Sequence, residues 1–426
     1  MTRIVLTSSD DISPRHAVKG AFAMEHGSTS PDSGVTVSGD QMVIDSSTSR
    51  SDRRQRLEPT AWEREVPGTA GIAYTTEIAT TTATPVPIQR HLDSPWFLNN
   101  DSWRIYPSPG NADSISFLDS GLEYFIASVR RWLDEWLNEG HNAFIHPRLY
   151  SGNGHLPDCL GDAYAAYQTY CSVTSSNKKV ALRVVGNFAK RLVENQNLFD
   201  DLEAETLDIQ SHLGRTQALL VFQMIRLFDG DIRSRAEGEA DSSTLIKWSY
   251  QLMHRAASIS SDAHSDRRDS GDNSSSPQPT IQPTKTYPHA LSLRSDGTVA
   301  STWRAWILSE SIRRTWIIAT LTEAAYAILK HGLAACPGTI SFTSRAGLWD
   351  ATSPQQWLSR LGGDEPGYRA LSEDHGFPLT CADVPGLLDE AQPDHIDDLT
   401  HKLIIYSVGC EEWNDWKESR GDKSVY

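Results

Sequence analysis

The sequence is poor in cysteine, and the positions of the few cysteines exclude several kinds of protein. Its 426 residues include five cysteines, and the first of them is residue 159. No two of them lie close enough for a zinc knuckle, and the odd number argues against a disulfide framework. We therefore expect reduced thiols and an intracellular protein. The five are Cys159, Cys171, Cys336, Cys381 and Cys410.

Long hydrophobic runs are absent as well. No stretch approaches the roughly 20 apolar residues of a membrane span, and the N-terminal sequence MTRIVLTSSDD lacks the apolar core of a signal peptide. Convincing alternation of apolar and polar residues, which is typical of half-buried strands, is also missing. The sequence predicts an all-α fold without membrane segments.

Positive charge is in deficit, since 39 Lys and Arg stand against 55 Asp and Glu, a formal net charge of −16. Such a surface repels phosphate, which argues against unaided DNA binding by the chain as a whole. A small basic module could still bind DNA, although the net charge of the whole chain is negative. The only basic cluster before residue 94 consists of Arg50, Arg53, Arg54 and Arg56. This cluster fits a solvated charge run or a nuclear-import signal.

Apolar residues are also scarce, at 38% of the chain. Residues 1–94 are rich in Ser, Thr, Asp, Gly and Pro, and residues 258–298 are rich in Ser, Asp, Pro and Gln. Segments of this composition cannot bury enough apolar surface to offset the entropy of folding. We predict a disordered N-terminal region, residues 1–94, and a disordered insertion, residues 258–298. The two parts of one multi-helix domain are then residues 95–257 and 299–418.

Helical periodicity dominates the remainder of the chain. Ser116 and Asp119 resemble a capping box before an apolar stripe that begins at Leu118, and Gly140 is placed to end that helix. Further apolar patterns and turn residues predict more helices, ending in terminal helices that reach about Trp416. The predicted helices after the first one cover residues 156–171, 178–194, 213–228 and 232–257.

Residues 301–332 carry the strongest pattern. Ser301 or Thr302 can cap the start of this helix, and Gly332 can adopt the left-handed conformation after its end. Glu310 and Arg314 lie four residues apart on its apolar face, in the order that favours an ion pair within one helix. We predict a central, mostly buried helix with an ion pair in its apolar seam. The apolar face also holds Trp303, Trp306, Ile307, Ile317, Ile318, Leu321, Ala324, Ala325 and Ile328.

Two acidic groups are the best candidates for enzyme chemistry. Asp200 and Asp201, followed by Glu203 and Glu205, resemble the magnesium-binding helix of a terpene cyclase, because clustered carboxylates bind Mg²⁺ and so a diphosphate. The polar residues of the partner motif would be Asn414, Asp415, Ser419 and Asp422. The spacing fits neither motif, and the histidines do not pair at metal-ligand spacing. We therefore predict no enzyme and no catalytic, cofactor-binding or metal-binding residue.

Four segments resemble one known family in the same order along the chain. WRAWILSESIRRTW (303–316) is similar to a signature in the regulatory domain of fungal zinc-cluster transcription factors. The other three segments lie at residues 144–170, 215–237 and 336–357. The resemblance spans roughly residues 95–416 and implies an all-helical regulatory domain. Its structural signature residues would be Trp303, Trp306, Glu310, Arg313, Arg314, Trp349 and Trp357.

The chain departs from this family at its N-terminus. The family reads DNA through six cysteines that bind two zinc ions, and residues 1–158 contain no cysteine, so we expect no zinc cluster in this chain. The resemblance then implies a nuclear regulator of a metabolic or secondary-metabolite gene cluster. It would act through a DNA-binding partner, in a homo- or heterodimer. Two alternatives stay open: a magnesium-dependent lyase that uses Asp200 and Asp201, and a direct DNA-binding factor that uses the cluster from Arg50 to Arg56.

Overall fold

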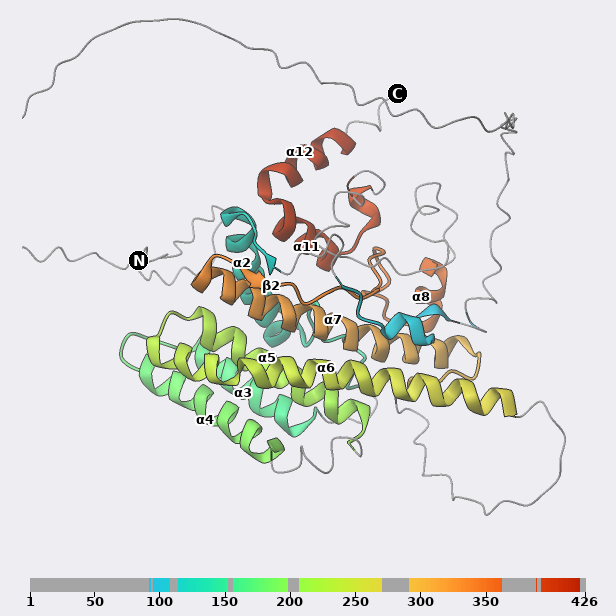
Figure 1. Ribbon diagram of the computed structural model, residues 1–426, viewed down its shortest axis with the longest axis horizontal. Helices are drawn as coiled ribbons and strands as arrows, with labels where there is room; N and C mark the ends of the chain where they lie inside the picture. The colour runs from blue at the N-terminus through green and yellow to red at the C-terminus, as the bar shows by residue number, and fades with distance from the viewer. Residues whose placement is uncertain are drawn as a thin grey trace, which may run out of the picture. The chain divides into compact units, whose positions relative to one another are not determined.

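The computed structural model describes Leu92, Leu388 and residues 95–107, 114–151, 156–197, 207–269, 291–361 and 392–421. Regular structure in these ranges is helical except for two short strands, which confirms the all-α prediction (Figure 1). The strands are β1 (Ser114–Ile115) and β2 (Ala334–Ala335), paired antiparallel. Most of the predicted N-terminal disordered region and the middle of the predicted insertion, residues 270–290, lie outside the described residues.

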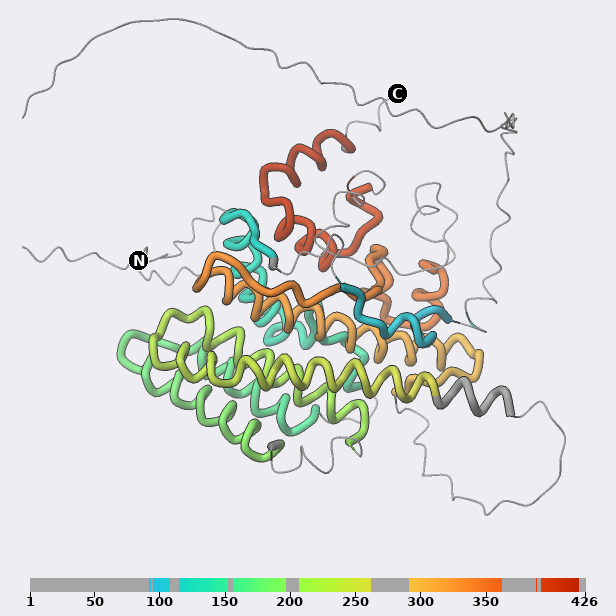
Figure 2. Tube along the Cα trace, viewed as in Figure 1, coloured from blue at the N-terminus to red at the C-terminus, as the bar shows by residue number. Residues whose placement is uncertain are grey.

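Helices α3 to α6 form a bundle that packs on one side of the central helix α7, Val299–His331 (Figures 1 and 2). Helix α5 is the middle of this bundle, since it packs against α3, α4, α6 and α7. Its residues are almost all buried, in agreement with the apolar face predicted for residues 213–228. The bounds are α3 (Asp158–Cys171), α4 (Lys178–Asn197), α5 (Ile209–Phe228) and α6 (Ile232–Asp269).

Other elements cover the opposite side of α7. Two 3-10 helices, η1 (Trp96–Leu98) and η2 (Asn100–Trp103), pack on α7 and α6 respectively. Helix α2 (Asp119–Glu139) packs against α11 (Asp398–Val408). The last described elements are α8 (Pro354–Leu361), η5 (Pro393–His395) and α12 (Cys410–Gly421).

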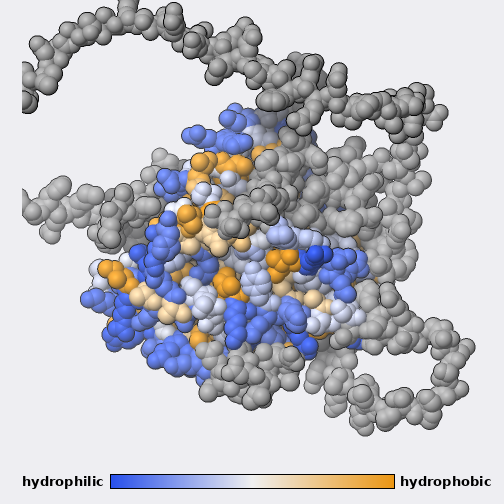
Figure 3. Space-filling model, in the orientation of Figure 1, coloured by the Kyte–Doolittle hydropathy of each residue, from blue (hydrophilic) through white to orange (hydrophobic). Residues whose placement is uncertain are grey.

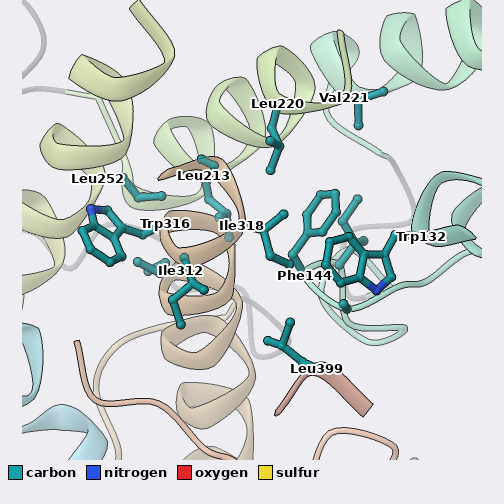
Figure 4. Close-up of a cluster of buried hydrophobic side chains, with 14 of the residues drawn as sticks. Trp132, Phe144, Leu213, Leu220, Val221, Leu252, Ile312, Trp316, Ile318 and Leu399 are labelled. Carbon is teal, nitrogen blue, oxygen red and sulfur yellow. The ribbon is translucent and has the colours of Figure 1, made fainter. Parts of the chain in front are cut away.

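Helix α7 is buried around its whole circumference rather than along one stripe. Every residue from 305 to 320 is buried, including Ser309, Ile312 and Trp316, which lie outside the predicted apolar face. Figure 4 shows the reason: Trp316 and Ile318 project from opposite sides of α7, one toward α6 and the other toward α5. The predicted central buried helix is confirmed. The expectation that one apolar face carries the burial is wrong, because the periodicity argument assumes one solvent-facing side.

The ends of α7 and the start of α2 test the capping residues that were predicted from the sequence. The N-cap of α7 is Thr298, whose side chain accepts a hydrogen bond from the Ser301 backbone N–H, so neither Ser301 nor Thr302 is the cap. Gly332 ends α7 with φ 80°, as predicted. Helix α2 begins without a side-chain cap, and Leu118, which was predicted on its buried stripe, is 59% exposed. The capping box at Ser116 is therefore not formed.

The boundary predicted at residue 258 is also wrong, because α6 continues to Asp269. Ser260 is buried there and accepts a hydrogen bond from the Trp103 indole nitrogen at 2.9 Å. The hydroxyls of Ser258 and Ser261 donate to carbonyls four residues earlier, which allows serines in a helix that composition alone disfavours. Near the C-terminal end of the predicted insertion, but still inside it, Leu293 is buried in the main core.

One face of the molecule shows how hydrophobic residues are distributed on the described surface. In the view of Figure 3, hydrophobic residues appear as separate patches among hydrophilic ones. Within the ranges that the structure describes, no helix combines the length and apolar character needed to cross a membrane.

Candidate functional site

Helix α7 carries three charged side chains, Glu310, Arg313 and Arg314, that are almost completely buried. Their exposed fractions are 0%, 0% and 1%. A buried charge is costly unless hydrogen bonds and an opposite charge replace the lost water. The surroundings of the three side chains therefore show which parts of the fold must stay together.

Arg314 is held by two carboxylates that lie far apart in the sequence. Its Nε donates to Glu310 Oε1 at 3.0 Å, which confirms the predicted ion pair, and its Nη2 donates to Asp397 Oδ2. Nη2 also donates to the Thr343 carbonyl at 3.0 Å, and the guanidinium lies 4.0 Å from the centre of the Trp349 ring. Arg314 thus joins α7 to the 343–349 segment and to the start of α11.

The electrostatics agree with this arrangement. Burial alone lowers the pKa of Arg314, but the charges of Asp397 and Glu310 outweigh it and leave the pKa above its ordinary value. Burial raises the pKa of Glu310, which the nearby charges of Arg314 and Arg313 oppose. Asp397 has a second structural role, because its Oδ1 accepts the Thr400 backbone N–H and so caps α11. The network is a charge-assisted junction between helices.

Arg313 points in a different direction and holds the first described segment. Its guanidinium carbon lies 3.9 Å from the centre of the Trp103 ring and 5.2 Å from that of Trp96. Nη2 donates to the Phe97 carbonyl at 2.7 Å and to Ser102 Oγ at 2.8 Å. Burial lowers the pKa of Arg313 to about 10, so the group stays charged at neutral pH. Cation–π contacts and carbonyl dipoles replace its water shell.

Aromatic side chains surround the start of α7 and include the remaining predicted signature residues. Trp306 packs against Trp349 and Trp357, with ring centres 6.2 Å and 5.8 Å away, and its indole nitrogen donates to Thr343 Oγ1 at 3.2 Å. Trp349 donates to the Asn142 carbonyl at 3.0 Å. The indole nitrogens of Trp306 and Trp349 are thus satisfied by a hydroxyl and a backbone carbonyl, whereas those of Trp303 and Trp357 are buried without a hydrogen-bond partner among the described residues.

His146 lies within the same aromatic cluster and was missed in the sequence. Its ring packs edge-on against Trp349 at 5.0 Å and against Trp306 at 6.2 Å. Burial, assisted by the positive charge of Arg314, lowers the pKa of His146 to about 3. The imidazole is therefore neutral at physiological pH. No local pattern in the sequence marks this position as buried, since a histidine beside a turn is usually exposed to solvent.

The structure places all the predicted signature residues in the buried core. Glu310, Arg314 and Trp349 are in direct contact, and Trp306 links them to Trp357. Trp303 lies near His146 at the edge of this group, whereas Arg313 lies on another side of α7. Their assignment as a family signature stays a prediction. Nothing in this arrangement is open to a substrate, so we interpret the residues as structural.

A second polar layer connects α7 to the helical bundle. Gln217 of α5 donates to Thr315 Oγ1 of α7 at 3.1 Å and accepts from the Tyr150 hydroxyl at 2.5 Å. Further along α5, Gln223 donates to Glu323 of α7 at 3.0 Å. Buried amides that are paired in this way fix the register of two helices, because a shift would leave them without partners.

The bundle contains a cavity of about 720 Å³ between α3, α4 and α5. Its charged lining has both signs, Asp158, Asp162 and Asp208 against Arg191 and Arg215, and Arg191 is paired with Asp162 at 2.5 Å. The volume is in the range of small-molecule sites, but the mixed and partly paired lining selects no ligand chemistry.

The candidates for metal chemistry and for direct DNA binding are largely outside the described residues. Asp200, Asp201 and the cluster from Arg50 to Arg56 are among these, while Asn414 and Asp415 are exposed on α12. In the part of the chain that the structure describes, no group of His, Cys, Asp and Glu is placed to hold a metal ion. The cysteines described, Cys159, Cys171, Cys336 and Cys410, are free thiols.

Comparison with known proteins finds a similarity to a transcription factor. The chain is 32% identical over 279 residues to "Transcription factor gsfR2" of Penicillium aethiopicum. The aligned part is 65% of this chain and 57% of that protein, so the chain spans just over half the length of the curated relative it matches. No family model and no solved structure matches the chain. The similarity supports a transcription regulator and does not favour the enzyme alternative.

Proposed function

We propose that this protein is a nuclear transcription regulator of a metabolic or secondary-metabolite gene cluster, and that its helical part, which includes all of α6 and Leu293 of the main core, forms its regulatory domain. The observation that carries the proposal is the similarity to a transcription factor over 279 residues. The helical domain is compatible with it, because the buried charges of Glu310, Arg314 and Asp397 join helices.

We assign DNA reading to a partner protein. Residues 1–158 contain no cysteine and so cannot supply the ligands of a zinc cluster, and the net charge of −16 opposes binding to phosphate. A regulator of this kind acts by presenting protein surfaces, as a homo- or heterodimer, to a DNA-bound partner. The four arginines from Arg50 to Arg56 then serve nuclear import rather than DNA contact.

Deletion of the gene tests the main proposal. We expect transcripts of a group of neighbouring biosynthetic genes to change together, in one direction, when RNA from the deletion strain is sequenced. Re-expression of the full chain should restore them. Unchanged transcripts of every gene cluster under conditions in which the protein is expressed would contradict the proposal.

A mobility-shift assay tests the assignment of DNA reading. The purified full chain should not shift promoter DNA of the affected genes by itself, and it should retard that DNA further when the partner is present. The matched variant replaces Arg50, Arg53, Arg54 and Arg56 with Ala. A specific shift by the chain alone that weakens steeply with salt and is lost in this variant would instead support direct DNA binding.

A further inference from the structure

The large apolar side chains that stay exposed are concentrated at one end of the helical domain. Helices α4 and α6 begin at this end and α7 ends there, on the left in Figure 1. Two ion pairs lie at the same end, Lys178 with Asp229 at 3.0 Å and Lys330 with Glu239 at 2.8 Å. Five of the seven large apolar side chains that are exposed in the described ranges lie here, and we call them the end patch. The end patch consists of Leu118, Val180, Ile232, Leu329 and Leu333.

The short strand pair brings the start of α2 to this end. Ile115 of β1 is opposite Ala334 of β2 in an antiparallel register. Leu118, three residues after Ile115, and Leu333, one residue before Ala334, therefore lie beyond the same end of the pair. Leu333 is 55% exposed and Ile232, at the start of α6, is 83% exposed. Exposed apolar side chains that gather in this way are typical of an interaction surface, whereas scattered ones need no explanation.

The two sides of the end patch carry charges of opposite sign. Figure 1 shows the beginnings of α2 and α4 on opposite sides of the end of α7 and the start of α6. On the α4 side, Lys179 and Arg183 are exposed in the first two turns, which contain no carboxylate. On the α2 side, Asp119 and Glu123 are exposed in the first two turns, which contain no cation. The end patch thus has an apolar centre between a basic side and an acidic side.

A surface of this kind is complementary to a copy of itself. Rotation about a two-fold axis in the plane of contact places the basic side of one copy opposite the acidic side of the other, and it does so twice. A partner whose charge has one sign would match one side of the end patch and be repelled by the other. Elsewhere two copies repel each other, because the chain has a net charge of −16.

We propose that the end patch is the contact between two copies of this chain in a two-fold homodimer. The apolar side chains of one copy pack against those of the other, and the start of α4 in each copy lies against the start of α2 in its partner. The inference deepens the dimer of the function proposed above and rests on that function only in this respect. Oligomeric state and gene regulation can therefore be tested separately.

Sedimentation velocity of the purified full chain, over a range of concentrations, tests the contact. We expect a concentration-dependent dimer in the wild type. Ile232→Glu with Leu333→Glu should weaken it at least about tenfold, because both changes place charge in an apolar contact. Leu156→Glu, at an exposed leucine outside the end patch, is the control and should equal the wild type. An unchanged melting temperature shows that the double variant remains folded.

Charge reversal tests the two-fold arrangement. Lys179→Glu with Arg183→Glu makes both sides of the end patch acidic, and Asp119→Lys with Glu123→Lys makes both sides basic. Each variant alone should dimerise at least about tenfold more weakly than the wild type, because like charges then face each other. In a mixture of the two variants every basic side meets an acidic side, so we expect a heterodimer that regains most of the wild-type affinity.

Lys190→Glu with Lys247→Glu is the matched control for charge reversal. It changes the net charge by the same amount at exposed positions outside the end patch, so its dimer should be as tight as that of the wild type. A wild-type chain that is monomeric at every concentration would overturn this inference and assign the end patch to another protein. A dimer that the variants do not weaken, or a mixture that does not recover, would overturn it as well. Unchanged transcripts in the deletion strain would overturn the proposed function and leave the dimer standing.

Discussion

Helices α7 and α12 both bury tryptophans and both carry several charges, but they use them in opposite ways. In α7 the charges are inside, where Arg314 meets Glu310 and Asp397, and the main core encloses the helix. Among the described side chains of α12, Trp413 and Trp416 are the buried ones, and the carboxylates face water. The two rings lie in a small hydrophobic cluster, here called the satellite cluster, together with Leu388, Ile396, Ile404 and Ile405. The same residue types make one helix the centre of the fold and leave the other at its edge.

This difference indicates where the fold is stable and where it can change. Buried charges that connect distant segments are lost only together, because removing one partner leaves the other uncompensated. Helix α12 is held at the edge of the fold by two rings and by hydrogen bonds from Trp416 and Arg420 to the Leu388 carbonyl. We expect it to open at a smaller free-energy cost than the whole domain, in the way that peripheral segments open locally.

The largest effect is expected from Arg314→Met. The substitution leaves Glu310 and Asp397 buried without their cation and should lower the free energy of unfolding by about 3–5 kcal/mol. The measurement is thermal and urea unfolding of the purified chain. Lys330→Met is the matched control on the same helix, since its pair with Glu239 is open to solvent and should contribute little to stability. A melting temperature equal to that of the wild type would contradict the buried network.

Arg313→Lys should have the next largest effect. A lysine keeps the charge but lacks the planar guanidinium that lies against Trp103 and donates to Phe97 and Ser102, so we expect a loss of about 1–3 kcal/mol. Urea unfolding measures it. Arg304→Lys, half-buried on the same helix, should stay within about 0.5 kcal/mol of the wild type. Equal losses in the two variants would mean that the Arg313 site is not specific for arginine.

His146 should make stability depend on pH. Its pKa is about 3 in the folded protein and near 6.5 in the unfolded chain. Between pH 3 and pH 6.5 the imidazole is therefore protonated in the unfolded chain and neutral in the folded protein. Stability is therefore complete above about pH 6.5 and falls as the pH decreases toward 3, by at most about 1.4 kcal/mol per pH unit. Unfolding at pH 7, 6 and 5 measures the slope.

The matched variants for this pH dependence are His146→Gln and His254→Gln. His254 is exposed on α6, so its replacement should leave the slope unchanged, whereas replacement of His146 should flatten it. A slope that is the same in all three proteins would assign the pH dependence to other groups.

Local patterns in the sequence were sufficient for the parts of the site that lie within one helix. The Glu310–Arg314 pair and the end of α7 at Gly332 follow from spacing alone. The second partner of Arg314 is Asp397, 83 residues away, and the carbonyl of Ser102 that meets Arg313 is 211 residues away. No periodicity encodes such pairs, because they depend on how the helices pack. For the same reason the sequence predicted one buried face on α7, although the helix is surrounded.

Hydrogen exchange compares the stability of the two helices directly, without a change in the stability of the whole domain. Amides of α12 should exchange through local opening, orders of magnitude faster than those of α7 between residues 305 and 320, which should exchange near the rate of global unfolding. Ile405→Ala should accelerate exchange in α12 and leave α7 almost unchanged, because Ile405 belongs to the satellite cluster. Mass spectrometry of peptic fragments measures both segments in one sample. Equal protection of α12 and α7 in the wild type would mean that the two helices form one cooperative unit, and the contrast between them would then concern burial and not stability.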